Sequence, residues 1–91
     1  MKKTKVIKLI DSKFNLEDSK DVLMKLINYK IGFHEQHNFS CVERFGKPDE
    51  HSTRRIKELA ETKESLLFFI NEIGNQQVSL KIDSTIIIEI E

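Results

Sequence analysis

The C-terminal segment, residues 78–90, alternates apolar and polar residues, and this alternation strongly limits what the segment can fold into. Its aliphatic residues all occupy even positions: Val78, Leu80, Ile82, Ile86, Ile88 and Ile90. Successive side chains of a β-strand point to opposite faces, so a period of two places these residues on one face. The phase is kept through Asp83, Ser84 and Thr85, and we therefore expect β-structure with one apolar face.

Two chain paths preserve this phase. A hairpin with a three-residue loop at residues 83–85 would pair Ile82 with Ile86, whereas a two-residue loop would turn the later isoleucines to the opposite face. One uninterrupted, bent strand fits the pattern equally well, and the loop lacks the glycine that three-residue hairpins favour. We expect the hairpin, because strands of about 5–6 residues are typical and one of about 13 residues is not.

The N-terminal half of the chain contains a strand-like and a helix-like segment. Residues 5–10, "KVIKLI", are short, apolar and partly β-branched, which is typical of a strand. Asn15 is suited to cap a helix from Leu16 to about Phe33, whose large aliphatic residues share one broad face. Residues 38–45, "NFSCVERF", place apolar residues at alternating positions and predict a short strand or an extended connection.

A second helix follows the breaker Gly46-Lys47-Pro48. Asp49 is suited to cap it, and its apolar residues form a stripe that continues to Ile73. Gly74 then stands where a residue in the left-handed conformation commonly ends a helix.

These elements predict an α+β fold in the order β-α-(β)-α-β-β, with two amphipathic helices packed on one face of a small sheet. If residues 38–45 are not a strand, the chain is instead a helical hairpin flanked by strands. The length of 91 residues is that of a single domain, residues 1–91.

Composition narrows the functional classes. The chain has 15 Lys and Arg and 15 Asp and Glu residues, a balance that argues against a dedicated nucleic-acid-binding protein. Cys41 is the only cysteine, so no disulfide forms within the chain, and a reducing cytoplasm is the simplest compartment. The basic start "MKKTKVIKLID" contains an apolar run that is too short for a signal peptide. We therefore expect neither export nor a membrane anchor.

Rare metal-binding residues gather in the middle of the chain, and they are His34, His37, Cys41 and His51. Three or four such donors that converge on one point would bind zinc. Their spacing matches no standard zinc motif, and the histidines fit equally well as polar residues at the end of a core. No third group is placed to orient a Cys–His nucleophile, so we expect no cofactor and no catalytic residue.

The start of the second helix offers a basic candidate site, formed by Arg54, Arg55 and Lys57. Basic residues near a helix start can bind phosphate groups or nucleic acid. Acidic residues surround these three, and no glycine-rich phosphate loop precedes them. An ordinary solvated helix face is the simpler interpretation.

Two apolar residues are candidates for a protein interface. Helical projection turns Phe68 away from the apolar stripe, beside glutamates, and an exposed aromatic residue can anchor an interface. Ile87 faces away from its even-numbered neighbours. If its strand were at the edge of a sheet, the unpaired backbone groups would favour pairing with another chain. We therefore expect a small, non-catalytic protein–protein interaction or self-associating module, whose partner is another protein or a second copy. A metal- or ligand-binding domain and a weak nucleic-acid binder are the alternatives.

Overall fold

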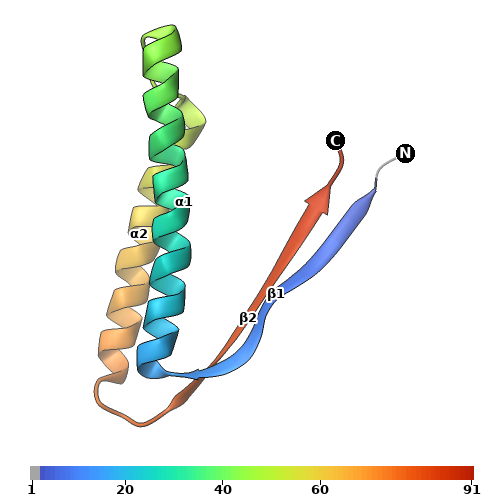
Figure 1. Ribbon diagram of the computed structural model, residues 1–91. Coiled ribbons are helices and arrows are strands. Elements are labelled where there is room, and N and C mark those ends of the chain that lie inside the picture. The colour runs from blue at the N-terminus through green and yellow to red at the C-terminus, as the bar shows by residue number, and fades with distance from the viewer. Residues whose placement is uncertain (1–2) are drawn as a thin grey trace. The chain divides into compact units, whose positions relative to one another are not determined.

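The described part of the chain forms two strands and two helices in the order β1 (Thr4–Asn15), α1 (Leu16–Phe45), α2 (Glu50–Ile73) and β2 (Ser79–Glu89) (Figure 1). This computed structural model describes residues 3–91. The α+β class is confirmed, with two helices and a two-stranded antiparallel sheet. The chain forms two compact units. One contains the β1–β2 ribbon with residues up to Ser19 and from Gln77 onward, and the other contains Lys20–Gln76, a helical hairpin.

The ribbon joins the two ends of the chain in one long antiparallel ladder. Thr4 is opposite Glu89 at one end, and Asn15 is opposite Ser79 at the other. The hairpin loop expected at residues 83–85 is wrong, because β2 runs through these residues without a turn. The first strand is also longer than the segment 5–10. Each strand can be this long because the other supplies hydrogen-bonding partners along its whole length.

A β-bulge at Leu9 determines which side chains of β1 share a face with those of β2. Lys8 pairs with Thr85 and Ile10 pairs with Ser84, so Leu9 has no opposite residue. The extra residue shifts the side-chain phase of β1 by one position. Directly opposite residues share a face, and seven of the ten paired side chains on one face are apolar. This face, called the apolar ribbon face below, also carries Lys5, Ser12 and Ser84, and its apolar residues are Ile7, Ile10, Phe14, Leu80, Ile82, Ile86 and Ile88.

The other face of the ribbon carries most of its charged residues and is called the charged ribbon face below. Asp11 is directly opposite Asp83, and Lys13 is directly opposite Lys81. Like charges in such positions repel each other. Diagonal ion pairs offset this repulsion: Lys8 Nζ lies 2.5 Å from Asp83 Oδ1, and Lys81 pairs with Asp11. The hydrogen bond from Lys81 lowers the pKa of Asp11, and the one to Asp83 raises the pKa of Lys8.

Helix α1 continues for 30 residues, well past its expected end. It begins at the predicted cap, where Asp18 N donates to Asn15 Oδ1 over 2.7 Å. The strand or extended connection predicted for residues 38–45 is wrong, because these residues are helical. An interior glycine such as Gly32 costs only about 1 kcal/mol in a helix, and contacts with α2 beyond it offset that cost.

The turn and the second helix follow the local signals in the sequence. Gly46 has φ 80°, and its N–H donates to Val42 O over 2.9 Å, which closes α1. Asp49 caps α2 by accepting a hydrogen bond from Ser52 N. Gly74 ends α2 with the expected positive φ of 67°, although its ψ of −134° lies outside the left-handed helical region. The capping predictions at Asp49 and Gly74 are therefore confirmed as helix boundaries.

Very few side chains are buried. Within residues 3–91, Ile70 of α2 is the only apolar side chain in the buried class, at 6% exposure. The buried polar side chains are Ser19, His34 and Ser52. Ser19 lies in the first turn of α1, where its hydroxyl donates to Asn15 O. Neither helix in this part of the chain has a stretch long and apolar enough to cross a membrane.

Candidate functional site

A buried histidine–serine contact joins the two helices of the hairpin. His34 Nδ1 lies 3.0 Å from Ser52 Oγ, and the two side chains are 6% and 2% exposed. Helix α1 presents His34 on the face that also carries Ile27, Ile31 and Cys41, and α2 presents Ser52 in its first turn. An imidazole beside a serine hydroxyl can activate a nucleophile. Here the burial of both groups keeps a substrate away from Oγ, so the contact is suited to holding the helices together.

A second set of polar contacts ties the same part of α1 to the start of α2. Asn38 Oδ1 accepts a hydrogen bond of 2.9 Å from Asp49 N, and Asn38 Nδ2 donates to Thr53 Oγ1 over 3.2 Å. Thr53 Oγ1 in turn donates to the carbonyl oxygen of Asp49. Further along the hairpin, Lys63 Nζ donates to Asn28 Oδ1 over 2.9 Å. These bonds explain why α1 stays helical after Gly32.

Sequence inspection did not identify Asn38 of α1 or Ser52 of α2 as residues that join the two helices. The available signal was the spacing of His34, Asn38, Cys41 and Phe45, which repeats every three or four residues and is typical of one helix face. That spacing becomes visible only if α1 is allowed to continue through Gly32.

The four metal-ligand candidates lie in the hairpin as two separate pairs. His37 Nε2 is 3.6 Å from Cys41 Sγ, one turn away on α1. The rings of His34 and His51 are 6.1 Å apart, centre to centre. Within residues 3–91, no group of three or more His, Cys, Asp and Glu side chains is arranged to hold a metal ion. A zinc site needs at least three converging protein ligands, and these pairs supply two each.

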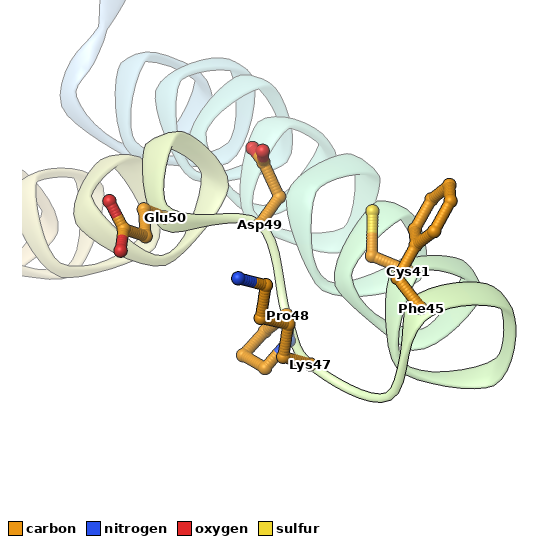
Figure 2. A pocket seen from close by; sticks show the side chains of 6 residues that line it. All are labelled: Cys41, Phe45, Lys47, Pro48, Asp49 and Glu50. Carbon is orange, nitrogen blue, oxygen red and sulfur yellow. The ribbon is translucent and has the colours of Figure 1, made fainter.

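An open hollow of about 420 Å³ lies at the turn between the helices, and Figure 2 shows the six residues that line it. The Cys41 and Phe45 side chains extend on one side of the turn, and the Glu50 carboxylate lies on the other. Asp49 already accepts the hydrogen bond from Ser52 N, which lowers the pKa of its carboxyl group. One thiol, one lysine and two spread carboxylates make no recognisable catalytic set.

The basic candidates are only partly available for an anion. Arg55 is half-buried, and its Nη1 lies 2.7 Å from Glu58 Oε2, so its charge is locally offset. Arg54 and Lys57 are exposed and lie three residues apart on α2. Nucleic-acid binding at this end of α2 therefore stays an untested prediction.

Both interface candidates are exposed. Phe68 is 68% exposed on α2, and Ile87 is 62% exposed on β2, opposite Val6 on the charged ribbon face. They belong to a larger set of exposed apolar side chains in each unit. In the ribbon these are Val6, Ile7, Leu9, Ile86, Ile87, Ile88 and Ile90; in the hairpin they are Leu26, Tyr29, Phe33, Phe39, Val42, Phe45, Phe68 and Phe69.

Comparison with known proteins does not assign this chain to a family. No protein-family model matches it, and no curated protein or solved structure is significantly similar to it.

The stability of the hairpin is expected to fall on mild acidification. Burial, followed by the positive charges of nearby basic side chains, lowers the pKa of His34 below its usual 6.5. The folded state therefore favours the neutral imidazole. The stability that this neutral group contributes above pH 6.5 is lost as the pH falls through the lowered pKa. Urea unfolding followed by circular dichroism between pH 7.5 and pH 5 measures this effect.

Two histidine variants separate this effect from other titrations. His34→Gln is expected to flatten the pH dependence more than His37→Gln does, because His34 is buried and His37 is exposed. Asp49 also has a lowered pKa, but its contribution is lost only below about pH 3.8. An unchanged slope in His34→Gln would show that another group controls the transition.

Proposed function

We propose that this protein is a non-catalytic association module that acts by assembling with further copies of itself. The observation that carries the proposal is the imbalance of apolar surface. One apolar side chain is buried within residues 3–91, and fifteen large ones are exposed. Single exposed apolar residues are ordinary, but fifteen of them against one buried apolar side chain favour burial against another surface.

The physics of each unit supports the proposal. A single two-stranded ribbon is marginally stable at best in water, and a pair of helices has only one seam along which to bury side chains. The net charge of zero removes the electrostatic repulsion that keeps many proteins monomeric. Association of copies supplies the burial that each unit lacks.

The absence of a role in catalysis is part of the proposal, and it rests on the buried state of the one histidine–serine contact. The other titratable groups near the turn are spread over an open hollow.

The arrangement predicted from the sequence, with the helices covering one face of the sheet, is a different way to cover the apolar residues. It would leave the chain monomeric, so sedimentation distinguishes it from self-association.

The test is sedimentation of the full chain over a concentration range of about 1–100 µM. We expect a mass that is a multiple of 10.7 kDa, and a melting temperature that rises with protein concentration, because association stabilises the folded state. A cooperative monomer at every concentration would contradict the proposal.

Phe68→Ser is expected to weaken self-association while the helical content stays constant, since the side chain is exposed and contributes little to folding. Tyr29→Ser removes an exposed aromatic ring from α1 and tests in the same way whether the interface includes that helix. Unchanged sedimentation of Phe68→Ser would remove Phe68 from the interface and leave the association itself intact.

A further inference from the structure

The outer edge of strand β2 is long and regular. Within residues 3–91 the sheet has two strands, so each strand is hydrogen-bonded to a neighbour on one side alone (Figure 1). Strand β1 contains the bulge at Leu9 and carries three lysines, and both features hinder pairing with a further strand. Strand β2 runs for 11 residues without a bulge and carries one lysine. The outer edge of β2 is therefore the better template for another strand.

The direction of the backbone groups identifies the residues of β2 that are available for pairing. Ile90 N donates to Lys3 O over 3.0 Å, so the even-numbered residues of this strand bond toward β1. In an antiparallel ladder such residues alternate with residues whose N–H and C=O point outward. The outward-pointing residues also share the charged ribbon face, and they are Lys81, Asp83, Thr85, Ile87 and Glu89.

These residues are complementary to a second copy of the same edge. When two β2 strands run antiparallel with Thr85 opposite Thr85, Lys81 of each strand lies directly opposite Glu89 of the other. Asp83 then lies opposite Ile87, so no two like charges are directly opposite. Opposite charges in such positions stabilise a ladder, whereas like charges destabilise it.

Other registers of the same two strands are less favourable. A centre at Ser84 leaves every charge of β2 opposite an uncharged residue. A centre at Asp83 brings two aspartates together, and a centre at Ile86 brings Asp83 opposite Glu89. Centres still further from Thr85 shorten the ladder. The charges of β2 therefore select the register centred on Thr85.

Both charged partners can take part in this contact. Glu89 forms no ion pair within residues 3–91. Lys81 pairs with Asp11 inside the ribbon, but its ammonium group has three donors and can bond to a second carboxylate.

We propose that β2 pairs edge to edge with β2 of a second copy, antiparallel and centred on Thr85. This inference rests on the proposed self-association and names its surface. The sheet then has the strand order β1-β2-β2-β1 and a two-fold axis perpendicular to it, so the contact closes as a dimer. A four-stranded sheet can be stable where a two-stranded ribbon is marginal. The apolar ribbon faces of both copies lie on one side of this sheet, so the pairing does not depend on what covers them.

Val6 and Ile87 give a matched test of the two outer edges. They are directly opposite each other, they are 60% and 62% exposed, and the N–H of each points outward. Proline lacks the N–H and is tolerated in a strand where that group faces solvent. Ile87→Pro is expected to weaken dimerisation about tenfold or more, because each dimer loses two hydrogen bonds. Val6→Pro should dimerise as the wild type does. Sedimentation equilibrium measures the affinity, and circular dichroism checks that the strands are retained.

Reversal of the paired charges tests the register without altering the backbone. Lys81→Glu and Glu89→Lys should each weaken the dimer at least about threefold, because each change puts like charges opposite each other twice. The double variant should recover most of the lost affinity, since opposite charges meet again. Lys13→Glu is the control, because it reverses a lysine on the same ribbon face but on β1. It should leave the affinity unchanged.

Each remaining outcome decides for or against the inference. If Ile87→Pro retains its strands and dimerises with wild-type affinity, the edge of β2 is not the interface, and the inference fails while self-association stands. Weakening by Val6→Pro alone would place the contact on β1 and would also overturn it. If Ile87→Pro loses its strands, the charge reversals decide, and a double variant no tighter than the single ones overturns the inference. A wild-type protein that stays monomeric would contradict both the inference and the proposed function.

Discussion

Ile70→Ala is expected to lower the free energy of unfolding by about 2–4 kcal/mol, which is a large share of the stability of a small domain. Ile70 is the one buried apolar side chain of residues 3–91, and it lies in α2 about two turns after Lys63, which bonds to Asn28 of α1. Truncation removes most of its apolar contacts and leaves a cavity that the neighbouring side chains fill only in part. Urea unfolding at one fixed protein concentration, followed by the helical signal, measures the loss.

Tyr29→Ala is the control for this prediction. It removes a larger side chain from the same helical hairpin, but Tyr29 is exposed, so the expected loss is less than about 1 kcal/mol. Equal losses in the two variants would mean that the burial of Ile70 does not stabilise the hairpin more than ordinary surface contacts do. The concentration is held fixed because association adds its own stabilisation.

Ser52→Ala is expected to cost about 1–3 kcal/mol, the second-largest effect among the single substitutions. The change leaves His34 Nδ1 buried without its hydrogen-bond partner, and an unsatisfied buried polar group carries its full desolvation cost. The helix cap survives, because Asp49 accepts its bond from the backbone N–H of residue 52 and not from the side chain. The same urea titration measures the change in unfolding free energy.

A double-mutant cycle tests whether the loss comes from the orphaned imidazole. His34→Leu combined with Ser52→Ala removes both polar partners, and replacing a buried pair by apolar groups can be nearly neutral. The double variant should therefore be more stable than Ser52→Ala alone. If the two losses simply add, the hydrogen bond between these side chains contributes no coupling energy.

The element boundaries that depend on neighbouring residues were predictable from the sequence. Asn15 and Asp49 cap helices because their side-chain oxygens reach N–H groups only three residues further on. Gly46 and Gly74 adopt positive φ at the two helix ends for an equally local reason. The even-numbered apolar residues of β2 do share one face, as the alternation indicated.

The candidate site was less predictable. His34 was a candidate metal ligand because histidines are scarce in the sequence. Its hydrogen-bond partner Ser52 lies 18 residues further along the chain, across the turn. The same holds for Asn38, which bonds to Asp49 and Thr53. No spacing rule along the chain connects these residues, because their contact depends on how two helices align side by side.

The sequence by itself determined the α+β class, the helix caps, the turn after Phe45 and the apolar phase of the last strand. Each of these depends on the chemistry of a few adjacent residues. The tertiary structure decided that α1 continues through Gly32 to Phe45, because bonds to α2 offset the weak helix propensity there. It also decided that β2 is one unbroken strand and that β1 contains a bulge at Leu9. Both follow from pairing between residues about 70 positions apart in the chain, which no local pattern encodes.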